Sequence, residues 1–334
     1  MTFQDMLLPA IEDEMRAVLP RLDGPRYAEM QAMLAYHLGW EGEGAGPKAR
    51  GKRVRPLLLL LTMAAAGGRW EAALPAAAAV ELVHNFSLIH DDIQDRSDTR
   101  RGRPTVWRKW GIAQAINAGD AMFTLAFIAL SRLRETVRAA IALEAHAVLQ
   151  NACLALTQGQ YLDLAYEQRH DLTEADYWPM IRGKTAALLA ACTDLGALVA
   201  EASTPIRAAY RRFGEHLGLA FQVQDDELGI WGDEALTGKP TASDLLEGKN
   251  TLPVLYGLAH SPHFARRWRQ GPLQPEAVPE MVAYLEACGA REYTRRKAAD
   301  LTAQALQALD EAQPQGEAGQ ALRALAMKLL ERKA

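Results

Sequence analysis

The sequence has few cysteines and no excess of basic residues. Its three cysteines, Cys153, Cys192 and Cys288, are widely spaced and form no CxxC pair. They predict neither a disulfide framework nor a cysteine zinc site, and a reducing compartment suits them. The net charge of -4 argues against a protein held on nucleic acid by its overall field. The sequence therefore predicts a cytoplasmic protein without a nucleic-acid partner.

Targeting signals and long apolar runs are also missing from the sequence. The chain starts with MTFQDMLLPAIEDEMRAVLP, which is acidic and amphipathic and lacks the basic start and the cleavage site of a signal peptide. The longest uninterrupted apolar run, PLLLLLTMAAAGG, is shorter than the ~20 residues that span a bilayer. We therefore predict no transmembrane segment.

Alanine- and leucine-rich segments dominate the chain, and short Gly or Pro punctuation separates them. They predict an all-α fold, a helical bundle in a single domain over residues 1–334, with Gly-rich charged loops at 41–53 and 231–250. Amphipathic helices are expected to follow residue 260. Before it, the predicted helices are 3–19, 25–38, 51–66, 72–96, 112–133, 135–168, 174–201, 205–232 and 251–259.

An unusual concentration of acid ends one of these helices, in LIHDDIQD at 88–95. On an ideal helix Asp91 and Asp95 differ by 40° and share a face, which His84 also joins, whereas Asp92 projects about 100° away. The preceding VELVHNFSLIH is nearly all core-like, so the acids emerge from the interior. Two carboxylates about 5 Å apart repel by ~3 kcal/mol at an effective dielectric of 20. A cation should therefore compensate them.

A second acidic pair, Asp225 and Asp226, follows an apolar helical run in FQVQDDELG. Carboxylates without accompanying Cys or paired His favour Mg²⁺, which prefers carboxylates together with substrate phosphates. Basic residues that can grip phosphate oxygens stand in GKRVR, RRGR, RGKTAA, TGKP and EGKN. These residues are Lys52, Arg53, Arg55, Arg100, Arg101, Arg103, Lys184, Lys239 and Lys249. Acids and bases together predict a diphosphate substrate bridged by Mg²⁺.

From Gly51 to Leu255 the chain resembles the trans-isoprenyl diphosphate synthases, or polyprenyl synthetases. The motifs in family order are GKRVRP, LIHDDIQD, RRGRPT, INAGD, QGQYLDL, GKTAAL, FQVQDDELG and GKPTASDLLEGKNTLP. The resemblance implies a homodimeric helical bundle whose two acidic motifs face each other across a deep cavity. It also implies Mg²⁺-dependent condensation of isopentenyl diphosphate with an allylic diphosphate, with three Mg²⁺ ions at the site.

The resemblance also assigns roles to residues. It implies that Asp91 and Asp95 ligate two Mg²⁺ ions and Asp225 the third, and the full metal-ligating set predicted from the two motifs adds Asp92 and Asp226. The positions that match allylic-diphosphate ligands are Arg100, Lys184 and Lys239. Those that match ligands of isopentenyl diphosphate are Lys52, Arg55, His84 and Arg101. Gln222 and Thr185 are expected to line the site, and Lys249 is a further substrate-binding candidate.

One position departs from the family pattern. Gly229 stands where the second motif, DDxxD, usually ends in aspartate. Asp233 lies about 12 Å from Asp225 by helix rise and cannot replace a metal ligand without a bend. We expect activity to survive and metal affinity to be affected.

Product length is set in the family by bulk at the fifth residue before the first motif, here Phe86, followed by Ser87. An aromatic residue there resembles enzymes that make C20 geranylgeranyl diphosphate. Farnesyl (C15) and longer (C25 and above) products stay open. Two other classes also remain, a class I terpene cyclase and a catalytically silent partner subunit.

Overall fold

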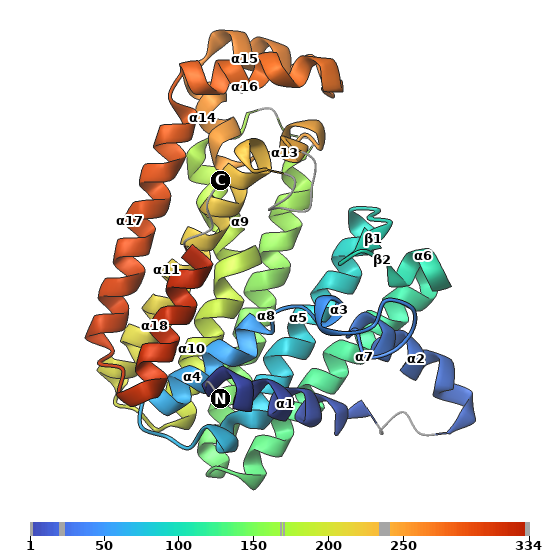
Figure 1. The fold of residues 1–334 in the computed structure, drawn as a ribbon, viewed down its shortest axis with the longest axis vertical. Helices are drawn as coiled ribbons and strands as arrows, with labels where there is room; N and C mark the ends of the chain where they lie inside the picture. Colours follow the sequence, from blue (N-terminus) through green and yellow to red (C-terminus); the bar gives the residue numbers. More distant parts are fainter. Residues whose placement is uncertain (1–2, 20–23, 168, 170, 234–240, 331–334) are drawn as a thin grey trace. The chain divides into compact units, whose positions relative to one another are not determined.

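The structure, a computed structural model, describes residues 3–19, 24–167, 169, 171–233 and 241–330 and is helical almost throughout (Figure 1). The predicted all-α class is confirmed. In the described residues the exception is a two-stranded hairpin of β1 (Thr99–Arg100) and β2 (Arg103–Pro104), with Thr99 paired to Pro104 and Arg100 to Arg103. The sequence analysis did not predict this hairpin.

The first half of the chain contains α1 (Phe3–Arg16), η2 (Pro25–Tyr27), α2 (Ala28–His37), α3 (Pro47–Arg50), α4 (Val54–Ala65), η3 (Trp70–Ala73), α5 (Leu74–Gln94), α6 (Val106–Trp110), α7 (Ile112–Ser131), η4 (Arg132–Glu135) and α8 (Ala139–Tyr166). The second half contains α9 (Glu174–Ile181), the π-helical turn η5 (Arg182–Ala186), α10 (Ala187–Val199), α11 (Thr204–Trp231), α13 (Ser243–Leu246), α14 (Leu252–His260), α15 (Pro262–Trp268), η6 (Pro275–Ala277), α16 (Val278–Ala287), α17 (Ala290–Glu311) and α18 (Gly316–Leu330).

The chain divides into two compact units that alternate along the sequence. The first unit comprises residues 1–150, 192–207 and 314–322. The second comprises 151–191, 208–313 and 323–334. That they form a single domain stays a prediction.

The core of the first unit is built on α4 and α5, which pack against each other and against α1. Residues 57–61 of α4 are consecutive leucines that are at most 3% exposed. Consecutive alanines of α5 are fully buried, and such small side chains let helices approach closely. Helices α5 and α7 run side by side (Figure 1), so closely that a Cβ on Gly119 would lie 2.2 Å from His90 Nε2.

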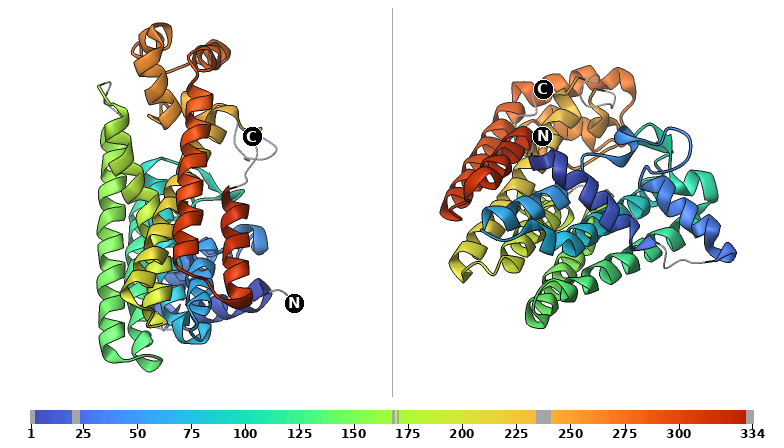
Figure 2. Two further views of the ribbon diagram at one scale, coloured as in Figure 1. Left: turned by 90° about the vertical axis from the view of Figure 1, so that its left-hand side faces the viewer. Right: turned by 60° about the horizontal axis from the view of Figure 1, so that its bottom comes forward.

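The second unit has its own core where α14, α15 and α16 gather at one end of α17 (Figure 1, Figure 2). Phe264, Met281 and Leu285 are fully buried there, together with Ile230 from α11 and Leu245 from α13. The short helix α13 is therefore fixed by hydrophobic burial next to α11.

Length and composition do not support the prediction that no segment could span a membrane. Three helical segments are long and apolar enough to cross one by those criteria: Trp70–Gln94, Ile112–Glu135 and Ala139–Tyr166. An uninterrupted apolar run was the wrong criterion, because the most apolar windows of the three segments keep mean hydropathies of 1.4, 1.3 and 1.4 although isolated polar residues divide them. The most apolar windows of the three are 67%, 39% and 28% buried, so the last is the least covered.

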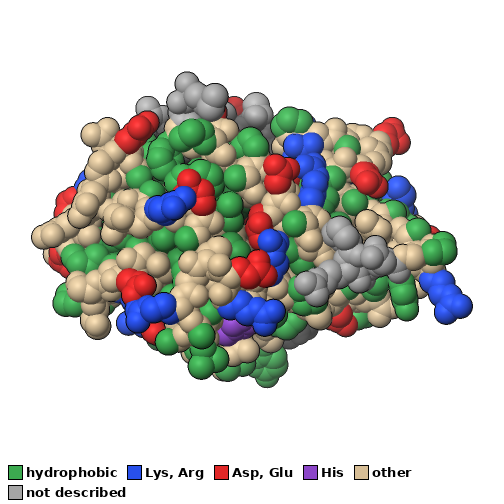
Figure 3. All heavy atoms as spheres, turned by 90° about the horizontal axis from the view of Figure 1, so that it is seen from below, with side chains coloured by type: hydrophobic (Ala, Val, Ile, Leu, Met, Phe, Trp, Pro, Cys, Tyr) green, Lys and Arg blue, Asp and Glu red, His purple; other side chains and the backbone are tan. Residues whose placement is uncertain are grey.

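The face drawn in Figure 3 has no broad area of one charge among its described residues. Basic and acidic side chains are interspersed there with hydrophobic ones.

Candidate active site

The first acidic motif lies at the C-terminal end of α5. Asp95 caps this helix and is exposed, Asp91 is half-buried, and Asp92 is buried. The helix remains regular to its end, since Asp95 N donates to Asp91 O at 2.8 Å. Asp91 and Asp95 are therefore the two carboxylates of this motif that a ligand can reach, as the helical periodicity predicts.

Asp92 points to a different partner. Its Oδ1 accepts a hydrogen bond from Arg100 Nε at 2.8 Å, and the side chain of Asp92 is only 2% exposed. Burial raises the pKa of Asp92 to about 6, although Arg100 opposes the shift. Asp92 thus anchors the hairpin arginine to α5. Its predicted role as a metal ligand stays a prediction.

The hairpin presents Arg100 and Arg101 beside that motif. Arg101 and Gly102 form its turn with φ of 54° and 76°, the positive values that a two-residue hairpin turn requires. Arg101 Nη1 donates to Ala49 O at 2.9 Å and to Arg50 O at 3.0 Å. Burial is the main cause that lowers the pKa of Arg101 to about 10. The turn therefore reaches the loop that carries the other predicted cations.

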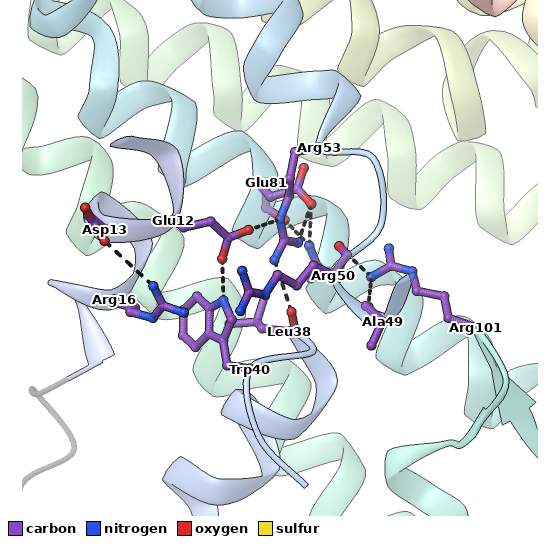
Figure 4. Close-up of polar contacts among 11 residues, drawn as sticks. Glu12, Asp13, Arg16, Leu38, Trp40, Ala49, Arg50, Arg53, Glu81 and Arg101 are labelled. Carbon is purple, nitrogen blue, oxygen red and sulfur yellow. Dashed lines mark hydrogen bonds and ion pairs between the residues drawn. The ribbon is translucent and has the colours of Figure 1, made fainter. Parts of the chain in front are cut away.

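That loop is held by Arg53, which the sequence analysis listed among the basic residues without a role (Figure 4). Its guanidinium donates to Glu12 Oε1 at 2.7 Å, to Glu81 Oε1 at 2.9 Å and to Leu38 O at 3.1 Å. Lys52, which precedes Arg53 in the sequence, is exposed, and Arg55, in the first turn of α4, is half-buried. The Nε of Arg55 is buried without a hydrogen-bond partner in the described structure. A buried donor without a partner is costly, so an anionic ligand beside it would be favoured.

His84 shares this cationic environment. Burial, with Arg55, Arg101 and Arg100 nearby, holds the pKa of His84 well below its usual range. A neutral imidazole among arginines can donate or accept a hydrogen bond without adding charge. A small pocket beside the hairpin is also rich in cations, since Arg100, Arg101 and Arg103 line it with Asp92. The first unit therefore combines accessible acids with a cluster of arginines whose charge would attract a polyanion.

Phe86 begins a row of aromatic rings in the first unit. Its ring centroid lies 4.7 Å from that of Phe123, which lies 5.1 Å from that of Phe127. Phe86 is half-buried, so it is not a fully enclosed core residue. Ser87 Oγ bonds back to His84 O at 2.8 Å and stays within the helix.

The second acidic motif lies on α11 in the second unit and divides in the same way as the first. Asp225 is exposed, whereas Asp226 is 3% exposed. Asp226 accepts from Tyr177 Oη at 2.6 Å, Gln222 Nε2 at 2.9 Å and Leu252 N at 3.0 Å. Burial raises the pKa of Asp226 to about 7. Asp226 thus ties α11 to α9 and α14, and Asp225 is the accessible carboxylate.

Lys184 and Thr185 lie in the π-helical turn η5, a distortion that is frequent at functional sites. The turn fits closely against α8, because a Cβ on Gly159 would lie 2.0 Å from Lys184 N. Thr185 Oγ1 donates to Gln222 Oε1 at 2.7 Å. Lys184 Nζ pairs with Asp163 Oδ2 at 2.5 Å, a partner that sequence reasoning missed although it stands in QGQYLDL.

The remaining lysine candidates are less informative. Lys249 pairs with Glu247 at 2.7 Å, and Lys239 lies outside the described residues. Asp233 is exposed beyond the end of α11.

The donor set fits Mg²⁺ only together with a ligand. The accessible acids are carboxylates, the hard oxygen donors that Mg²⁺ prefers. Among the described residues, no group of three or more His, Cys, Asp or Glu side chains is placed to hold a metal. Each motif alone therefore offers too few carboxylates to enclose an ion, and phosphate oxygens and water would complete its coordination.

Comparisons with known proteins agree with a site that binds a metal ion together with a phosphate ligand. The family model for polyprenyl synthetase matches residues 46–285. A (2E,6E)-farnesyl diphosphate synthase of Mycobacterium tuberculosis is 44% identical over 259 residues, 77% of this chain and 70% of that protein. A geranylgeranyl diphosphate synthase of the same organism is 47% identical over 231 residues, 69% and 65% of the two chains.

A solved structure extends the likeness over nearly the whole chain. The geranylgeranyl pyrophosphate synthase of Corynebacterium glutamicum, complexed with isoprenyl diphosphate and magnesium, has a TM-score of 0.85 and 30% identity, covering 97% of this chain and 98% of that one.

Proposed function

The chain belongs to the polyprenyl synthetase family and is a short-chain trans-isoprenyl diphosphate synthase, and we propose that its product is C20 geranylgeranyl diphosphate. The proposed reaction joins isopentenyl diphosphate head-to-tail to an allylic diphosphate. One observation carries this reaction: accessible Asp91 and Asp95 lie in the same unit as a cluster of arginines that includes Arg100 and Arg101.

The proposed reaction breaks the allylic C–O bond and forms a C–C bond. The departing diphosphate takes the bonding electrons, so negative charge grows on it as the allyl cation forms. Arg100, which bonds to Asp92, and Lys184, on the π-helical turn, are proposed to neutralise that charge. The double bond of isopentenyl diphosphate then attacks C1 of the cation, and the departing diphosphate accepts the proton that is lost.

The second diphosphate requires its own cations. Lys52, Arg55 and Arg101 are proposed to bind isopentenyl diphosphate, with His84 as a neutral hydrogen-bonding group. The buried Nε of Arg55 that lacks a protein partner supports this assignment, because a buried donor is costly to leave unpaired.

Mg²⁺, when bound, would offset negative charge on the allylic diphosphate as its C–O bond breaks. Asp91 and Asp95 are proposed to hold two ions and Asp225 a third. The family relative that binds isoprenyl diphosphate and magnesium supports a magnesium requirement. Asp91→Ala should lower Mg²⁺-dependent condensation by orders of magnitude, and EDTA should abolish it until MgCl₂ is added back. Full turnover by Asp91→Ala would refute the metal assignment.

The proposal of a C20 product is based on Phe86 and on the neighbouring rings of Phe123 and Phe127. The relatives include both farnesyl and geranylgeranyl synthases, so C15 and longer products are the alternatives that an assay must separate. The protein should be incubated with isopentenyl diphosphate and C5, C10 or C15 primers, and the products weighed by mass spectrometry. A C20 diphosphate from every primer is expected. An olefin would indicate a cyclase, and no product from the protein alone would indicate a silent partner subunit.

A homodimer is proposed from the exposed apolar face of α8. Leu143, Leu154 and Tyr161 are 74%, 59% and 70% exposed, and their spacings of 11 and 7 residues place them within 20° on one helix face. Such a row is costly to leave in water. Leu154→Glu should convert a dimer to a monomer in light scattering, whereas Tyr27→Ser on η2 should not. A monomeric wild type would contradict the proposal. Localisation in the cytoplasm stays a prediction from the sequence.

A further inference from the structure

The gap in the second acidic motif is occupied by a side chain from elsewhere in the chain. Gly229 lies four residues after Asp225 on α11, one turn along nearly the same face. A Cβ at position 229 would lie 2.0 Å from Asp244 Oδ2 and 2.4 Å from Asp244 Cγ. The carboxylate of Asp244 therefore fills the space where a side chain at position 229 would begin.

Hydrophobic burial fixes α13, the short helix that carries Asp244. Ala242 and Leu245, on either side of it, are both 0% exposed and belong to the core of the second unit. Asp244 itself is 7% exposed, and its carbonyl accepts from Lys249 N at 3.0 Å. The packing of α13 therefore fixes the position of this carboxylate, which is not a freely rotating surface side chain.

The geometry places this second acid beside the accessible one. The backbones of Asp225 and Gly229 are about 6 Å apart along the helix axis, from four residues at 1.5 Å each. A carboxylate in contact with Gly229 therefore lies about one helical turn from Asp225, as a motif aspartate at 229 would. Ionised carboxylates this close repel one another, and a bound cation would relieve that repulsion.

We propose that Asp244 replaces the missing aspartate of the second motif and acts with Asp225 on the Mg²⁺ ion that this motif holds. The inference rests on the proposed function, because it concerns the same metal. Gly229 is then required for a specific reason: any side chain there would displace the carboxylate of Asp244. The alternative is that Gly229 leaves the motif one ligand short and that Asp244 is only a structural neighbour.

Three variants separate these accounts through metal uptake and not through turnover. The measurement is equilibrium dialysis of the folded protein against MnCl₂ with inorganic pyrophosphate, with the excess metal in the protein chamber quantified. Asp244→Ala should weaken binding of the ion at the second motif at least about tenfold and leave the two ions proposed for Asp91 and Asp95 in place. Gly229→Ala should weaken it too, although alanine favours the helix, because its Cβ displaces Asp244. The double variant G229D/D244A, which moves the carboxylate back to position 229, should recover uptake.

The matched control is Asp233→Asn, which removes one negative charge just beyond the end of α11. It should leave uptake within about twofold of wild type, since Asp233 lies about 12 Å from Asp225 by helix rise and is too far to share its ion. Helix content and the unfolding midpoint, followed by circular dichroism, confirm that each variant folds. The proposal is wrong if Asp244→Ala takes up metal as wild type does, or if Asp233→Asn loses as much as Asp244→Ala. A folded wild type that takes up no metal would instead overturn the proposed function, and this inference with it.

Discussion

The buried ion network around Arg53 gives a prediction that can be worked from the structure (Figure 4). The Arg53 side chain is 1% exposed, and its partners Glu12 and Glu81 are 9% and 3% exposed. Arg53→Met would keep the apolar volume and leave two buried carboxylates without their cation. Glu12 would retain a bond from Trp40 Nε1, and Glu81 one from Asn85 Nδ2. Breaking a buried ion network from one side costs about 3–5 kcal/mol.

The assay is urea unfolding followed by circular dichroism at pH 7 and pH 5. We expect Arg53→Met to lose about 3–5 kcal/mol of unfolding free energy at pH 7. The loss should shrink at pH 5, because the uncompensated carboxylates of Glu12 and Glu81 bind protons more readily in the folded variant than in its unfolded chain. Removing all three charges in R53M/E12Q/E81Q should recover much of the stability.

A surface ion pair in the same view serves as the control. Arg16 pairs with Asp13 at 3.7 Å, and the two side chains are 45% and 79% exposed. Arg16→Ala should change the unfolding free energy by about 1 kcal/mol or less, because it removes this exposed pair and a contact 4.9 Å above the Trp40 ring. If Arg53→Met costs no more than Arg16→Ala, or costs more at pH 5 than at pH 7, the network does not stabilise the fold as argued.

Three further predictions concern specificity, substrate binding and pH. Phe86→Ala should lengthen the product by at least one C5 unit, and F86A/F123A further, because the Phe123 ring centroid lies 4.7 Å from that of Phe86; an unchanged mass distribution would show that Phe86 does not limit product length. Asp92→Asn should raise KM for the allylic diphosphate about tenfold with a smaller change in kcat, since Arg100 loses a charge-assisted bond; equal KM values would contradict this role. Burial holds the pKa of His37 well below its usual range, so the folded state binds fewer protons than the unfolded chain. The unfolding free energy should therefore fall below about pH 6.5, by up to ~1.4 kcal/mol per pH unit, and urea unfolding of His37→Gln should show a shallower slope.

Most helices could be predicted from the sequence, because apolar periodicity and helix-forming residues agree along them. The predicted 112–133 and 205–232 correspond to Ile112–Ser131 and Thr204–Trp231. The prediction of one helix over 174–201 missed the π turn, which forms where Gly159 and Gly183 bring two helices into contact. The sequence analysis missed the β1–β2 hairpin for a different reason, because strands of two residues are too short to show an alternating pattern.

Helical periodicity also separated the acids of the first motif. It placed Asp91 and Asp95 on one face and Asp92 off it, and the exposure of the three side chains agrees. Partners from distant segments could not be predicted in this way. Asp163 lies 21 residues before Lys184, and Asp244 lies 15 residues after Gly229, so only the fold brings each pair together.

Two arginines with left-handed backbone conformations fix the basic loop and the β1–β2 hairpin. Arg53 has φ of 46° and Arg101 has φ of 54°, and each such residue costs about 1–3 kcal/mol when it is not glycine. Both side chains offset that cost with hydrogen bonds, Arg53 to two carboxylates and Arg101 to the carbonyls of Ala49 and Arg50. The two turns also meet, because a Cβ on Gly51 would lie 2.8 Å from Arg101 Cζ. The basic loop and the hairpin therefore hold each other in place, so a change in either turn should alter the cations that both present.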